Sequence, residues 1–151
     1  MRRIFTLMVL AILLTGCAQK NPYATILVEG TVKLDGVPTE GIHVNFTPIN
    51  DNGNSAGGLT GSSGKYKLTT GGAPVGSGAI AGEYHVTFSK TEIEGSNLSY
   101  EEYQKQIGDR QPKTTYLVPQ KYADSTTSGI SPVKVEKSKK NVFDFDLKTK
   151  E

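Results

Sequence analysis

The sequence has almost no cysteine, has no tryptophan, and contains only one long apolar run. Its 151 residues include a single cysteine, at position 17. Disulfide-stabilised secreted domains carry an even number of cysteines, so this chain must fold without disulfides, and it lacks a redox pair of thiols. The apolar run covers residues 4–14. It is shorter than the roughly 20 residues that a transmembrane helix needs.

Neither sign of charge dominates the chain. There are 17 basic and 15 acidic residues, and Arg2 and Arg3 both lie in the first 16 residues. Without that segment the basic residues fall to 15, equal to the acidic ones. A nucleic-acid-binding domain normally carries a basic patch, so we expect no nucleic acid as a partner.

The N-terminus has the layout of a secretory signal. Arg2 and Arg3 precede the apolar run, and small residues follow it, which is the order found in signal peptides. The run ends in Leu14-Thr15-Gly16-Cys17, which resembles the bacterial lipoprotein box. The resemblance implies that Leu14, Thr15 and Gly16 are recognised by the signal peptidase, that residues 1–16 are removed, and that Cys17 is lipidated. The alternative is an ordinary signal peptide followed by a chance cysteine.

The expected lipid determines where the protein resides. Residues 17–25 form the lipidated cysteine and a short polar tether, and residues 26–151 form the folded domain. We therefore expect a protein held on a membrane of the bacterial cell envelope, on the periplasmic or the outer-membrane side. Two or three acyl chains anchor stably, whereas one does not.

The rest of the chain favours an all-β domain. Apolar and polar residues alternate along several short segments, so each strand has one buried and one exposed face. Two such sheets pack their apolar faces together as a sandwich. No β-α-β pattern occurs, so a parallel sheet is not expected. The last two strands are predicted to form a hairpin around Ser138-Lys139-Lys140. The predicted strands are 26–36, 41–48, 61–70, 82–90, 131–137 and 141–147.

A long segment, residues 91–129, has no strong strand pattern and contains one predicted helix. Ser99 and Glu102 have the spacing of a capping box, and Gly108 is a natural helix end. The helix is too short to be stable alone, so it is expected to pack on the β domain.

Several motifs together resemble carboxypeptidase regulatory-like domains. Residues 30–46 contain a strand, an Asp35-Gly36 corner and a second alternating strand, and residues 60–66 and 82–86 match two further motifs. Gly61 stands where that family usually has aspartate. The ending, in residues 117–122, 127–129 and 141–147, is similar to that of small lipoproteins of this type. The resemblance implies a seven-stranded, Greek-key, transthyretin-like sandwich, and it implies no activity.

No catalytic, metal or cofactor site is expected. The sequence lacks a nucleophile elbow, a phosphate-binding loop and a zinc-protease motif. His43 and His85 are the only histidines. Two histidines on neighbouring strands make a poor zinc site, because zinc takes at least three protein ligands.

Four tyrosines in the long segment are the candidate contacts for a partner, namely Tyr100, Tyr103, Tyr116 and Tyr122. The competing interpretation is that they hold this segment on the sandwich. The sequence thus favours a non-enzymatic structural or protein-binding role in the envelope. The first alternative is a module that binds envelope or extracellular polysaccharide, for which tyrosines on one exposed platform are needed. The second is a transthyretin-like hydrolase, for which His43, His85 and a carboxylate must share a cleft.

Overall fold

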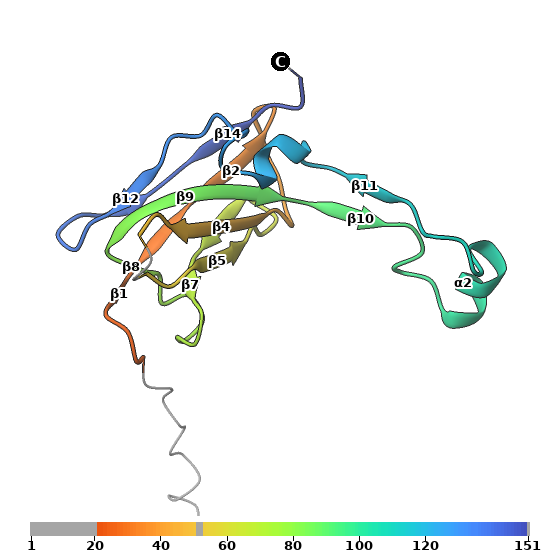
Figure 1. Cartoon of the computed structure of the whole chain (residues 1–151), viewed down its shortest axis with the longest axis horizontal. Coiled ribbons are helices and arrows are strands. Elements are labelled where there is room, and N and C mark those ends of the chain that lie inside the picture. The colour runs from red at the N-terminus through yellow and green to blue at the C-terminus, as the bar shows by residue number, and fades with distance from the viewer. Residues whose placement is uncertain (1–20, 51–52, 151) are drawn as a thin grey trace, which may run out of the picture.

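The computed structural model describes residues 21–50 and 53–150, and these residues form a β-sandwich from which a thin arm projects (Figure 1). This confirms the predicted all-β sandwich in outline. The first sheet has five strands in the order β12-β9-β4-β5-β7. The bounds of these strands are β4 His43–Pro48, β5 Ala56–Leu59, β7 Thr69–Thr70, β9 Gly82–Ser89 and β12 Val133–Val135.

Strands β4 and β9 form the centre of the first sheet. They pair antiparallel along their length, from His43 opposite Ser89 to Pro48 opposite Tyr84. Alternate side chains of both strands, including Phe46 and Phe88, are buried as the sequence pattern predicts. The large buried side chains of these two neighbouring strands therefore form one side of the core.

The second sheet is built around β2, Val28–Leu34. Strands β3 and β6 pair with β2 antiparallel, whereas β13 and β14 pair with it in parallel. The sheet is therefore mixed, and the absence of a β-α-β pattern did not reveal its two parallel pairs. A crossover helix is not needed here, because the chain reaches β13 from the other sheet. The partner strands are β3 Val37–Pro38, β6 Lys65–Lys67, β13 Asn141–Val142 and β14 Phe145–Leu147.

The predicted C-terminal hairpin is wrong. A turn does occur at Ser138-Lys139-Lys140, but the strands on its two sides belong to different sheets. The buried Asn141 side chain closes this turn: its Oδ1 accepts from the Glu136 N–H at 2.9 Å, and its Nδ2 donates to the Glu136 carbonyl at 3.1 Å. The turn therefore connects the two layers of the sandwich.

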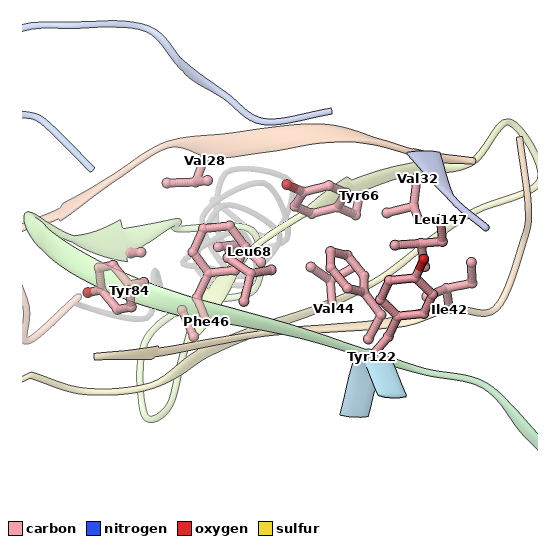
Figure 2. Packing of buried hydrophobic residues seen from close by; sticks show 14 of the residues in the cluster. Val28, Val32, Ile42, Val44, Phe46, Tyr66, Leu68, Tyr84, Tyr122 and Leu147 are labelled. Carbon is pink, nitrogen blue, oxygen red and sulfur yellow. The ribbon is translucent and has the colours of Figure 1, made fainter. Parts of the chain in front are cut away.

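The core lies between the two sheets (Figure 2). Val28 and Val32 of β2 and Leu147 of β14 face Val44 and Phe46 of β4 across it. The alternation in β14 is as predicted, since Phe145 and Leu147 pack against the core while Asp146 is exposed. Within the described residues each sheet of the sandwich contains five strands, some of them, such as β13 and β14, separated only by a few irregular residues.

The predicted turn at Asp35-Gly36 is confirmed. Asp35 and Gly36 both have positive φ, 52° and 83°, and form the tight turn between β2 and β3. This is the backbone that two-residue hairpin turns require. A separate two-stranded pair, β1 (Thr25–Ile26) and β8 (Ala79–Ile80), lies near the start of the described chain.

Candidate functional site

Residues 91–116 form an arm that leaves the sandwich at the end of β9 (Figure 1). Its two strands, β10 (Thr91–Ile93) and β11 (Thr114–Tyr116), pair antiparallel. Its tip carries helix α2 (Tyr100–Gln106). Sequence reasoning missed both strands, because every residue in them is exposed and the apolar alternation that marks a half-buried strand is absent.

The helix begins as predicted but lies elsewhere. The Glu102 N–H donates to Ser99 Oγ at 3.4 Å, and the Ser99 N–H donates to the Glu102 carboxylate at 3.0 Å, which completes the capping box. Gly108 follows the C-cap Ile107 with a φ of 57°. The helix does not pack on the sandwich; it sits at the far end of the arm (Figure 1).

The tip has a small packing centre of its own. Ile107 is only 5% exposed, although α2 itself contains no buried residue. A Cβ placed on Gly95 would lie 2.3 Å from Ile107 Cδ1 and 3.0 Å from Tyr103 Cδ2. The φ of Gly95 is also positive, at 78°. Glycine at this position therefore lets the turn after β10 approach the helix closely, which makes the tip an ordered unit.

An ion pair ties the two sides of the arm together. Arg110 donates through both terminal nitrogens to the Glu94 carboxylate, at 2.8 and 2.7 Å, and the Lys113 N–H donates to the same carboxylate at 3.1 Å. These hydrogen bonds, the one from Arg110 first, lower the pKa of Glu94 to about 2. The carboxylate is exposed, so water screens the pair; its main value is geometric, because a two-pronged contact fixes the direction of both side chains.

The surface of the arm is open to contact. Ile93 is 50% exposed, Tyr116 52% and Tyr100 78%. A hollow of about 620 Å³ lies along the first strand and the turn that follows it. Its lining mixes carboxylates, an ammonium group and amide or hydroxyl groups: Glu92, Ile93, Glu94, Gly95, Ser96, Asn97, Lys113 and Thr115.

The structure separates the four candidate tyrosines. Tyr100 is on the helix at the tip, whereas Tyr116 pairs with Thr91 at the body end of the arm. Tyr103 is half-buried beside Gly95. Tyr122 is buried in a short 3-10 helix (Gln120–Ala123), and its hydroxyl accepts from the Lys148 N–H at 2.9 Å. Tyr122 therefore holds the sandwich together, and the exposed tyrosines do not share one platform.

The two histidines lie on the same outer face but not together. His43 pairs with Ser89, and His85 pairs with Thr47, four residues further along β4. Four residues of a strand span about 13 Å, too far for a shared metal ion. Among the residues that the structure describes, no three His, Cys, Asp or Glu side chains come together as metal ligands.

The exposed aspartates in and just before β14, Asp146 and Asp144, have structural partners. Asp144 Oδ1 accepts from the Thr31 N–H at 2.7 Å, and Asp146 Oδ1 accepts from the Gly36 N–H at 2.8 Å. They complete the hydrogen bonding of β2 and its turn. A second hollow, of about 420 Å³, lies beside Asp144 on the outer face of this sheet, among Glu29, Lys65, Lys67 and Lys140.

Cys17, together with Leu14, Thr15 and Gly16, lies outside the described residues. Within residues 21–50 and 53–150, no helix has the length and apolar character to cross a membrane.

No protein-family model matches the chain, and no curated protein matches it. Among solved structures it is similar to a candidate adhesin from Bacteroides ovatus, at 19% identity and a TM-score of 0.45, over 90% of this chain and 49% of that one. It is also similar to a 9R-lipoxygenase from Cyanothece, at 12% identity and a TM-score of 0.37, over 91% of this chain and 17% of that one. The chain thus spans less than half the length of either protein. Similarities this low do not bear on what the chain binds.

Proposed function

We propose that the chain is a lipid-anchored protein of the bacterial cell envelope that has no catalytic role and binds a protein partner through its arm. The observation that carries the proposal is the arm itself. It is internally ordered by the capping box, the Glu94–Arg110 pair and the Gly95 contact, yet it is exposed on all sides of both strands.

The physical argument is that an isolated two-stranded ribbon is only marginally stable in water. Among the described residues, β10 and β11 pair only with each other, so each has one edge of unpaired N–H and C=O groups. Such an edge accepts an added strand from a partner. Exposed aromatic side chains such as Tyr100 and Tyr116 are the kind that carry binding energy at protein interfaces.

The anchor is the second part of the proposal. It rests on the lipoprotein-like box that ends at Cys17 and on the short polar segment before β1. Lipid on Cys17 accounts for the position of the single cysteine, and it would hold the sandwich close to a membrane.

The finer fold assignment belongs to the same proposal. We infer that the sandwich is a transthyretin-like Greek key of the carboxypeptidase regulatory-like type. In the antiparallel order β9-β4-β5-β7, β9 lies beside β4 as the fourth strand of a Greek key lies beside the first, with β6 of the other sheet inserted between β5 and β7. This strand order supports the fold assignment together with the sequence motifs in residues 30–46, 60–66 and 82–86.

A protein partner is favoured over polysaccharide because the exposed tyrosines lie at opposite ends of the arm. Sugar rings stack on aromatic rings that form one platform, and Tyr100 and Tyr116 do not form one. A strand edge and scattered apolar residues suit a polypeptide better.

The test is photo-crosslinking in intact cells, with a photoreactive amino acid at Tyr100. The matched control carries it at Leu59, which is 56% exposed on β5 of the sandwich. We expect one defined protein adduct from the arm position and none from the control. Polysaccharide recovered from the Tyr100 position, or the same adducts from both positions, would contradict the proposal.

The anchor is tested separately with Cys17→Ser. The domain should stay folded, because Cys17 lies before the first strand, but it should move from the membrane fraction to the soluble fraction. Retention of this variant in membranes would remove the lipid anchor from the proposal and leave the arm to be judged by the crosslinks alone.

A further inference from the structure

At the apex of the loop from Gly71 to Gly78, one apolar side chain is almost fully exposed to solvent. Val75 is 96% exposed, more than any other large apolar residue that the structure describes. It is flanked by Pro74 and by Gly76, whose φ is 73°. An apolar side chain this exposed is a candidate for contact with another molecule.

Hydrogen bonds hold the loop in shape. The Gly76 N–H donates to Thr69 Oγ1 at 2.8 Å, and Thr70 Oγ1 donates to the Gly78 carbonyl at 2.9 Å. The Ser77 N–H donates to the Pro74 carbonyl at 3.1 Å. Val75 is therefore presented by a structured turn, and its exposure is a property of the fold.

The loop and its flanking residues contain no charged side chain. Residues 68–82 contain no Asp, Glu, Lys, Arg or His. Placing these residues themselves against a lipid bilayer thus requires none of their side chains to lose the hydration of a charge, which is the largest cost of such a contact.

The loop lies beside Tyr23, a residue that is close to Cys17 in the sequence. Tyr23 lies only six residues after Cys17, a stretch that spans at most about 20 Å when fully extended. A Cβ on Gly72, in the loop, would lie 3.5 Å from the Tyr23 hydroxyl. Strand β1, which follows Tyr23, pairs with β8, which follows the loop. The loop is therefore held at the point where the tether joins the sandwich.

We infer that the Val75 loop, residues 71–78, rests on the membrane surface to which Cys17 anchors the protein. The inference rests on the proposed anchor and goes beyond it, because it orients the sandwich. A single valine binds a bilayer weakly by itself. The anchor keeps the loop at a high local concentration next to the bilayer, so the weak contact becomes an intramolecular one.

The same geometry places the arm away from this contact. Strand β8 precedes the start of β9, and the arm follows its end. The eight residues of β9 span about 26 Å. A sandwich that rests on the Val75 loop therefore holds the base of its arm at the other end of its longest strand.

The test uses the full lipidated chain with Val75→Cys, labelled with an environment-sensitive fluorophore and reconstituted in phosphatidylcholine vesicles. The lipid blocks the thiol of Cys17, so the label is specific. The matched control is Leu59→Cys, an exposed apolar position on β5 opposite His43, at the arm end of the sheet. We expect a blue-shifted emission at position 75 and quenching by iodide about threefold weaker than at position 59, because a loop at the headgroup boundary is shielded from water.

The outcomes separate this inference from the anchor. Equal quenching at both positions, on a chain that floats with the vesicles, overturns the inference and leaves the anchor standing. A chain that does not float overturns both. The same label on the Cys17→Ser chain should stay in water; a blue shift there without vesicles would show that a second copy of the protein covers the loop, which also overturns the inference.

Discussion

At the scale of single residues, the contact of Gly30, Tyr66 and Phe143 shows how tightly the second sheet is built. A Cβ on Gly30 would lie 1.8 Å from the Phe143 carbonyl oxygen. The Tyr66 hydroxyl donates to that same oxygen at 2.8 Å. The carbonyl of an irregular residue between β13 and β14 is thus turned towards β2, where the absence of a side chain makes room for it.

Gly30→Ala should destabilise the fold strongly. The new methyl group meets a backbone atom, which cannot rotate away, so the cost should reach about 3 kcal/mol or more. Urea unfolding measures it. Gly71→Ala is the matched control, because a Cβ there meets nothing within 4 Å, and it should change stability by less than about 0.5 kcal/mol. Similar effects of the two substitutions would show that the Phe143 carbonyl does not lie where we place it.

Tyr66 should make stability fall at alkaline pH. Burial raises the pKa of Tyr66, because the charged phenolate is poorly solvated inside the protein. The neutral form is favoured by folding, so this contribution is complete below the unfolded pKa of about 10 and is lost as the pH rises above it. Tyr66→Phe should cost about 1–2 kcal/mol at neutral pH, through the lost hydrogen bond.

The measurement is the free energy of unfolding as a function of pH, compared between the wild-type chain and Tyr66→Phe. From pH 9 to 11, a range set by the ordinary tyrosine pKa of about 10, the wild-type chain should lose more stability than Tyr66→Phe. Equal slopes in urea unfolding would assign the alkaline loss to other groups, of which Tyr84, with a pKa also raised by burial, is one.

At the scale of elements, the arm is a unit whose order depends on few contacts. The Glu94–Arg110 pair joins the turn after β10 to the segment after α2, and the strands themselves contribute no buried side chain. The tip should therefore open locally without unfolding the sandwich, as weakly packed segments do.

Glu94→Gln should loosen the tip. It removes the carboxylate that Arg110 and the Lys113 N–H both contact. Hydrogen exchange should accelerate in residues 95–112 and stay unchanged in β4 and β9. Glu92→Gln, an exposed carboxylate two residues earlier, is the control and should leave exchange as in the wild-type chain. Accelerated exchange in β4 after Glu94→Gln, or no change at the tip, would contradict the role of the pair.

The pH dependence of the tip follows from the same carboxylate. The folded pKa of Glu94 lies near 2, below the ordinary value of 4.5. Its contribution is therefore present above the unfolded pKa and is lost as the pH falls through the folded one. Protection of the tip should persist at pH 4 and decline towards pH 2, and this decline should be smaller in Glu94→Gln.

At the scale of the whole molecule, the sandwich should be independent of its arm. The Leu117 N–H donates to the Lys90 carbonyl at 2.9 Å, so the two ends of the arm are adjacent where they leave the sandwich. After Leu117 the chain returns to the core through the buried Val118 and Tyr122. The arm is thus an insertion between β9 and this return.

Replacing residues 91–116 with an Asn-Gly turn should leave a folded sandwich. The two residues to be joined, Lys90 and Leu117, are already adjacent, and an Asn-Gly turn suits a short connection of this kind. The free energy of unfolding should therefore change by about 1 kcal/mol or less. Urea unfolding should stay cooperative, and crosslinking to the partner should be lost. In contrast, truncation after Lys140 removes β13 and β14, the parallel partners of β2, and should abolish folding. A shortened chain that fails to fold would show that the arm belongs to the core structure.

Much of this protein followed from local residue patterns alone. The alternation in β4 and β9, the Asp35-Gly36 turn and the capping box at Ser99 were all predicted, because each depends on residues only a few positions apart. The exposed strands of the arm were not predicted, since they carry no apolar pattern. The sequence shows two histidines on predicted strands, but the distance between His43 and His85 depended on the register of β4 with β9.

The tertiary structure alone decided which strands pair and where the long segment goes. Alternation in residues 141–147 shows which side chains are buried, but parallel pairing with β2 rests on contacts more than 100 residues apart in the chain, such as Asp144 with the Thr31 N–H. The same holds for Gly72 beside Tyr23, which brings the Val75 loop to the tether. Local propensity sets turns, caps and faces; the choice among partners comes from packing between distant segments, which no short stretch of sequence encodes.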